Sequence, residues 1–275
     1  MKKDNFIKRF LLLYLPLTIL LVFMLFPFIW TFITSIKPPS ELYSISFLPK
    51  KATFENYINL FKSTDFLLNM RNSLIVAVST TVITLCTTLL AAYAFSRYRF
   101  RGKKVFLTVF LTINMFPSIL LLVPLFSIMR VIHILYTPMA LVLSYSTFTI
   151  PFSVWMLTGF LNDLPRALEE AAMIDGCSRI MAFMRIIMPI AIPGVVATGV
   201  YIFINSWNEY TYAVMFTNEA TRTIPVALKL LVGEFNIQWG LLTAGGIITI
   251  LPICVMFMFV QKSLIQGLTA GAVKG

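Results

Sequence analysis

Six long apolar runs constrain the fold of this 275-residue chain more than any other feature. Each is about twenty residues long and poor in charge, and they cover roughly residues 10–33, 74–95, 105–126, 138–160, 186–206 and 241–260. About 20 helical residues rise about 30 Å, which matches the hydrocarbon core of a bilayer. Hydrophobic residues make up 59% of the chain and charged residues 12%, which is outside the range of soluble domains. The sequence therefore predicts an all-α integral membrane protein with about six transmembrane helices.

Basic residues between the runs predict the orientation in the membrane. The turn between the second and third runs holds five Lys and Arg residues within eight positions, from Arg97 to Lys104. Such clusters stay on the cytoplasmic side. Both termini and the segment 161–185 then face the cytoplasm. No small-residue cleavage site follows the first run before Lys37, so we expect that run to remain a membrane helix rather than a cleaved signal.

The cytoplasmic segment 161–185 carries its own helix signals. Asn162 and Asp163 are candidate N-caps ahead of Pro165, and Gly176 offers the left-handed position at which a helix stops. The intervening helix of about eleven residues would be roughly 16 Å long, too short to span a bilayer. One face, at i, i+3, i+4 and i+7, is thin enough to fit a groove on another protein and comprises Leu168, Ala171, Ala172 and Asp175. The alternative is an amphipathic connector that rests on the bilayer surface.

The same segment resembles a known motif. Glu170-Ala171-Ala172, three residues, Gly176, nine residues and then Ile186-x-Met188-Pro189 resemble the EAA loop of permease subunits of binding-protein-dependent ABC importers. Met188 stands where that motif usually has Leu. The resemblance implies the type I ABC importer permease (MetI-like) fold and a coupling helix that docks on a cytoplasmic ATPase. The docking residues it implies are Leu168, Glu169, Glu170, Ala171, Ala172, Asp175 and Gly176.

The last fifteen residues resemble the terminus of the second permease of maltose-type carbohydrate importers, where a glycine-rich tail enters the ATPase interface. In this chain the tail is 261–275, and the interface residues implied are Gly271, Ala272, Lys274 and Gly275. A frayed terminus is the alternative interpretation.

Polar and aromatic residues that interrupt the apolar runs are candidates for a substrate pathway, because polar groups at membrane depth usually face protein or water. Asn114, Pro117 and Pro124 interrupt the third run, and Pro151 and Trp155 the fourth. The fifth run ends in a polar cluster whose W-N-E resembles the same position in sugar-transporting permeases. The candidate pathway residues are Asn114, Trp155, Asn205, Trp207, Asn208 and Glu209. Packing, caps and an interfacial aromatic belt are the alternatives.

The outer loop 211–240 ends where the permease family places a loop that probes the docked binding protein. The residues at that position are Gly233, Glu234, Phe235 and Asn236. The resemblance implies that they contact the binding protein.

Absent motifs narrow the function. The chain has no G-x-x-x-x-G-K-[ST], so ATP and Mg are expected on a partner ATPase, with no cofactor bound by this chain and no catalytic residue. Cys86, Cys177 and Cys254 are scattered and His133 stands alone, so neither a disulfide framework nor a metal site is expected. The runs lack the Asp, Glu or Lys of a proton-coupled carrier.

The sequence thus predicts one transmembrane domain over 1–275. The resemblance implies that it is a permease domain, part of an importer that moves a sugar, an oligosaccharide, into the cytoplasm across a bacterial cell membrane. The expected partners are a second related permease in a heterodimer, a cytoplasmic ATPase dimer, an extracellular solute-binding protein, membrane lipid and the sugar, without nucleic acid. Alternatives are a permease for a non-sugar solute such as glycerol phosphate, and an ion-coupled secondary carrier.

Overall fold

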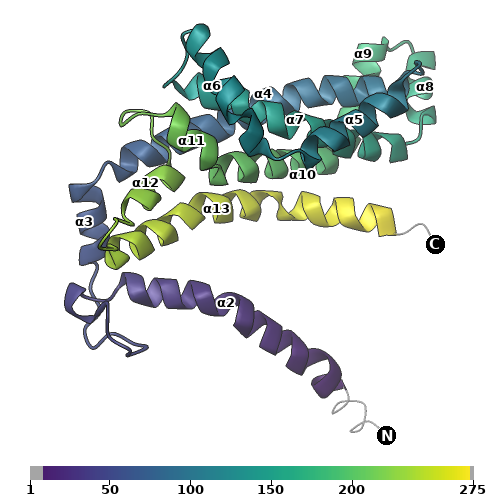
Figure 1. The fold of residues 1–275 in the computed structure, drawn as a ribbon. Helices are drawn as coiled ribbons and strands as arrows, with labels where there is room; N and C mark the ends of the chain where they lie inside the picture. The colour runs from purple at the N-terminus through teal and green to yellow at the C-terminus, as the bar shows by residue number, and fades with distance from the viewer. Residues whose placement is uncertain (1–8, 273–275) are drawn as a thin grey trace, which may run out of the picture. The chain divides into compact units, whose positions relative to one another are not determined.

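The computed structural model describes residues 9–272, and side chains up to Lys262, as a series of helices (Figure 1). Within this described part, β pairing is limited to an isolated bridge between Val232 and Ile237. The helices are η1 Phe10–Tyr14, α2 Leu15–Ser35, η2 Pro39–Glu41, α3 Glu55–Ser63, α4 Phe66–Arg97, α5 Lys103–Met115, η3 Ser118–Leu121, α6 Leu122–Val131, α7 Pro138–Asp163, α8 Ala167–Ile174, α9 Arg179–Ala182, η4 Phe183–Ile187, α10 Met188–Asn208, α11 Thr211–Phe216, α12 Ile224–Leu230 and α13 Trp239–Ala272.

Long apolar helices account for the predicted spans. Those long and apolar enough to cross a membrane are Phe10–Ser35, Phe66–Arg97, Pro138–Asp163, Arg179–Asn208 and Trp239–Lys262. The third predicted span is not one straight helix: α5 and the η3–α6 stretch are bent by 94° at a short break. Phe116 is extended there, with φ −76° and ψ 133°, because the ring of Pro117 disfavours the helical region for the residue before it. Counting this bent pair as one span gives the expected six.

By internal contacts, the described residues divide into two compact units. One comprises the described residues up to Leu67 together with Ala227–Leu251, and the other comprises Leu68–Val226 together with the part of α13 from Pro252 onward. In the first unit the amide of Asn56 donates to the carbonyls of Ser35 and Lys37, each at 2.8 Å. Asn56 thereby fixes α3 against the end of α2.

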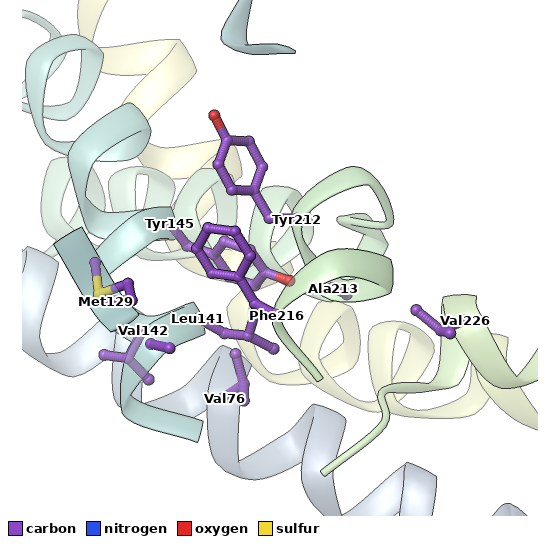
Figure 2. Close-up of a cluster of buried hydrophobic side chains, with 10 residues drawn as sticks. Val76, Met129, Leu141, Val142, Tyr145, Tyr212, Ala213, Phe216 and Val226 are labelled. Atoms are coloured by element: carbon purple, nitrogen blue, oxygen red, sulfur yellow. The ribbon is translucent and has the colours of Figure 1, made fainter. Parts of the chain in front are cut away.

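The second unit is held by two apolar clusters on the α4–α7 pair. The first cluster joins α4, α6 and α7 to α11, and Figure 2 shows the rings of Tyr145, Tyr212 and Phe216 gathered in it. The second cluster joins the far ends of α4 and α7 to η4 and α10, and comprises Ala92, Leu157, Leu161, Phe183, Ile187 and Ala191. Gly194 of α10 lies so close to α7 that a Cβ there would stand 2.5 Å from the ring of Phe160. These clusters position the two candidate sites.

Candidate functional sites

Helix α8 forms within the segment predicted to dock on a partner, but it begins later than its cap signals indicated. Asn162 and Asp163 are not its N-caps, because α7 continues through Asp163 and the chain then turns at Leu164 and Pro165. The N-cap position is Arg166, which makes no side-chain cap. Helical continuity of the preceding span thus overrides the local preference of Asn and Asp for a helix start.

The end of α8 matches the expectation. Gly176 has φ +89°, and nothing lies within 4 Å of where its Cβ would be. Its N–H donates to the Met173 carbonyl at 3.1 Å, and the N–H of Cys177 donates to the Ala172 carbonyl at 3.0 Å. This pair of bonds is a Schellman motif, which requires a left-handed residue and therefore favours glycine. The side chain of Ser178 then caps α9 by accepting from the N–H of Met181.

The seven residues implied for docking do not all face outward. Glu169 and Ala172 are buried inside the chain, 5% and 7% exposed. The exposed members are Leu168, Glu170, Ala171, Asp175 and Gly176. The i, i+3, i+4, i+7 spacing predicted that Ala172 is on an outward face of α8. Ala172 is instead buried inside the chain, where α8 packs against η4.

Glu169 lies in a buried ionic cluster at the base of α4. Its Oε2 accepts from the Nε of Arg97 at 2.9 Å, and its Oε1 accepts from the hydroxyl of Tyr93. Both charged side chains are almost fully enclosed, at 6% and 7% exposed. The Nη1 of Arg97 also donates to the Leu161 carbonyl of α7, and Arg166 donates to the Ser96 carbonyl of α4. The cluster therefore connects α4, α7 and α8.

Large apolar side chains near Gly176 are exposed and were missed by the sequence analysis. Ile174 is 87% exposed and Ile180 is 78% exposed, while Met184 is 59% exposed. Apolar residues on both sides of a glycine turn, in a segment too short to span, were the signal that could have identified them. Together with the outward residues of α8 they form a surface that we name the α8–α9 patch. Its exposed apolar members are Leu168, Ile174, Ile180, Met181 and Met184.

A cavity of about 200 Å³ opens among α5, η3, α7, α10 and α11. Asn114 from the third apolar run, and Asn205 and Glu209 from the end of the fifth, come together in its wall. The lining residues are Asn114, Ser118, Tyr145, Phe148, Thr149, Tyr201, Asn205, Ser206, Glu209 and Tyr212. The other three candidates lie elsewhere. Trp207 is 1% exposed and stacks on Phe203, Trp155 contacts Phe152, and Asn208 is exposed outside the cavity.

Several polar groups in the cavity wall have unused hydrogen-bonding capacity. The hydroxyl of Ser206 is buried and has no partner within hydrogen-bond distance, and the buried hydroxyl of Tyr145 faces the carboxylate of Glu209. Asn114 and Asn205 each donate their amide N–H to the carbonyl four residues earlier, which leaves the amide oxygen available to accept. A buried polar group without a partner costs free energy, so such groups favour a polar ligand or water in the cavity.

Glu209 and Tyr212 shape this cavity through helix α11. The carboxylate of Glu209 accepts from the N–H groups of Tyr212 and Ala213 at 2.9 and 3.1 Å and so caps α11. The Tyr212 hydroxyl donates to the Ser118 carbonyl at 2.6 Å. Burial and the nearby carboxylate of Glu209 raise the pKa of Tyr212 to about 12, so its hydroxyl stays protonated and remains a donor. Tyrosines within apolar segments were the signal for the lining that the sequence analysis did not use.

The loop predicted to contact a binding protein forms a tight turn in the first unit. The N–H of Gly233 donates to the Asn236 carbonyl at 3.1 Å, next to the bridge between Val232 and Ile237. All four predicted residues are exposed, Phe235 at 94%. In the predicted tail, Gly271 and Ala272 lie in the last turn of α13, while Lys274 and Gly275 lie outside the described residues.

The sequence analysis expected neither a metal site nor a disulfide framework. Over residues 9–272, no cluster of three His, Cys, Asp or Glu residues has the geometry to hold a metal ion. Cys86, Cys177 and Cys254 are free thiols.

Comparison with known proteins identifies the family. A family model described as "Binding-protein-dependent transport system inner membrane component" matches residues 83–270. The chain belongs to this family. It is 38% identical over 265 residues to the sulfoquinovosyl glycerol transport system permease protein of Agrobacterium fabrum, covering 95% of this chain and 93% of the relative. It is 35% identical over 277 residues to the trehalose/maltose transport system permease protein of Thermococcus litoralis, covering 99% of both.

A solved structure supports the fold. The chain resembles a subunit in the crystal structure of a bacterial ABC transporter involved in the import of the acidic polysaccharide alginate, with a TM-score of 0.81 and 21% identity over 96% of this chain and 98% of that one. A second structure, of the bacterial alginate ABC transporter in complex with an alginate pentasaccharide-bound periplasmic protein, gives a TM-score of 0.69 at 20% identity over 93% and 94% of the two chains. The expected MetI-like fold is therefore confirmed. The chain is a multi-pass membrane component of a transport system, not an enzyme.

Proposed function

We propose that this chain is a permease subunit of an ABC importer that moves a sugar, an oligosaccharide, into the cytoplasm. The observation that carries this proposal is the cavity, in which the buried hydroxyl of Ser206 has no partner and lies beside free amide oxygens, in a chain of the binding-protein-dependent family. Sugar hydroxyls both donate and accept, so they suit Tyr145 and Ser206 as well as Asn114 and Asn205. Relatives named for trehalose/maltose and diacetylchitobiose transport support the substrate class.

Charge in the cavity favours a neutral sugar over an anionic solute such as glycerol phosphate. Its wall contains one carboxylate, that of Glu209, and no Lys or Arg. A phosphate or carboxylate ligand would meet that charge without a compensating cation, which is costly in a site of low dielectric. Tyr201 and Phe148 add aromatic rings on which a sugar ring can pack.

The α8–α9 patch supplies the contact with a cytoplasmic ATPase, which would hold ATP and Mg. Exposed apolar side chains around a short helix form a surface suited to a groove on a partner. Closure of the ATPase pair would move α8, and the helices joined to it would switch the cavity between outward and inward access. Because a ligand shifts an equilibrium only through differential affinity, ATP must favour the outward state.

The remaining partners complete the importer. A second related permease would pair with this chain as a heterodimer, and an extracellular solute-binding protein would deliver the sugar to the loop at Gly233–Asn236. The C-terminal tail would add to the ATPase contact through Gly271, Ala272, Lys274 and Gly275. Both termini would lie on the cytoplasmic side of a bacterial cell membrane, and the basic cluster from Arg97 to Lys104 supports this orientation.

Co-purification from mildly solubilised native membranes, followed by mass spectrometry, tests the assembly. We expect an ATPase, a second permease and a solute-binding protein to travel with this chain. The same complex in proteoliposomes, with ATP inside and the binding protein outside, is then assayed with neutral and acidic sugars of matched size. ATP-dependent uptake of neutral sugars supports the proposal. Recovery of the chain alone, or uptake driven by an ion gradient without ATP, contradicts it.

A further inference from the structure

Helix α8 has two kinds of connection to the rest of its unit. Chain continuity joins it to α7 at one end and, through α9 and η4, to α10 at the other. Helix α4 is distant in sequence, and its attachment to α8 is made by side chains. Glu169 accepts from Tyr93 and Arg97, which lie 76 and 72 positions earlier, and Arg166 reaches the Ser96 carbonyl at 2.8 Å.

The Glu169 cluster is buried and held by several hydrogen bonds. Glu169 is 5% exposed, and each of its carboxylate oxygens accepts a hydrogen bond from a side chain of α4. Arg97 uses a second nitrogen to donate to the Leu161 carbonyl of α7 at 3.1 Å. Hydrogen bonds assisted by charge are about twice as strong as neutral ones, and water competes little at a buried site. The carboxylate of Glu169 and the guanidinium of Arg97 together therefore connect α8, α4 and α7.

Helix α4 also reaches the cavity side of the unit. The Thr84 hydroxyl, further along α4, lies 3.1 Å from the Ser146 hydroxyl and 3.5 Å from the Thr149 hydroxyl of α7. Thr149 lines the cavity. The α4–α7 pair thus connects the Arg97 end of α4 with the wall of the cavity.

We infer that Glu169 is a positioning residue that transmits movement of α8 to α4, and so couples ATPase closure to the cavity. This inference rests on the proposed function. The inference gives two adjacent carboxylates different roles. Glu169 is buried within its own chain, whereas Glu170 is exposed and available to the partner ATPase. Sequence position does not distinguish the two, because both stand in the first turn of α8.

The test compares Glu169→Gln with Glu170→Gln in the complete complex with its ATPase and binding protein, reconstituted in proteoliposomes. Sugar uptake and ATP hydrolysis are measured on the same vesicles. Glutamine keeps the shape of the side chain but leaves Arg97 without a counter-charge. For Glu169→Gln we expect the ATPase to co-purify in normal amount while the sugar transported per ATP falls about tenfold, within the usual range of coupling between sites. For Glu170→Gln we expect less ATPase in the complex and a parallel fall of uptake and hydrolysis.

Two milder variants protect the test against a folding defect. Tyr93→Phe removes one hydroxyl from the cluster, and Arg97→Lys keeps the charge but loses the forked geometry. Each is expected to lower the sugar transported per ATP by about threefold with assembly intact. An unchanged ratio in Glu169→Gln, or in both milder variants if Glu169→Gln does not assemble, overturns the inference. Failure of the unmutated complex to transport sugar with ATP would instead refute the proposed function.

Discussion

Truncating Ile174 to alanine tests whether the α8–α9 patch is the ATPase contact. The side chain is 87% exposed, so little of its apolar surface is buried within the chain itself. Full burial of an isoleucine side chain stabilises by about 2 kcal/mol, so the truncation should cost the isolated fold only about 0.3 kcal/mol. If docking buries the exposed part, the association loses most of that free energy. The ATPase Kd should then rise about 20-fold.

The assay titrates purified ATPase against the solubilised permease pair immobilised on a biosensor. Ile45→Ala is the matched control, because Ile45 is 99% exposed and lies in the loop between α2 and α3, which we expect outside the cell. It should leave the Kd unchanged. A normal Kd for Ile174→Ala, or an equal loss in the Ile45 control, would refute the assignment of the patch.

Three further changes have outcomes that the structure specifies. Gly176→Ala forces a Cβ onto a residue in the left-handed conformation and should lower the stability of segment 161–185 by about 1–2 kcal/mol. Proteolysis at this turn should therefore be faster than in the control Gly159→Ala, because Gly159 is helical and has open space around it. Ala172→Leu overpacks a buried site and should destabilise the chain by about 1–3 kcal/mol, measured by thermal melting in detergent. Ala171→Leu changes an exposed site, so it should leave the melting temperature unchanged and weaken ATPase binding. Asn205→Ala removes a free amide oxygen from the cavity and should raise the KM for sugar uptake about tenfold without changing the amount of co-purified ATPase. The buried Trp207 should not cross-link to a photoreactive sugar.

Local signals predicted the backbone of segment 161–185 well where a single residue decides its conformation. Gly176 was expected to take a left-handed conformation, and its φ of +89° confirms this. The start of α8 was mispredicted because Asn162 and Asp163 are also compatible with the end of a long apolar helix, which continued through them. A cap signal indicates where a helix can begin, but the neighbouring span decides whether the preceding helix has ended.

The direction in which α8 faces depends on contacts that no local pattern contains. The 3.6-residue period places Ala171 and Ala172 on one face, yet one is exposed and the other is 7% exposed. The difference comes from η4 and from side chains of α4 more than seventy positions earlier. For the same reason the motif implied one shared role for Glu169 and Glu170, although the structure buries the first and exposes the second.

The break in the third span shows how a local irregularity becomes part of the cavity. Asn114 and Pro117 were recognised as interruptions of an apolar run, but the 94° bend they accompany could not be read from the sequence. At the bend, the Ser118 carbonyl is available to accept from the Tyr212 hydroxyl of α11. Irregular backbone at membrane depth is tolerated where protein groups satisfy it or where it lines a cavity, and both conditions hold here. Asn114 before the break and Ser118 after it both line the cavity, so residues on the two sides of the bend contribute to the candidate sugar site.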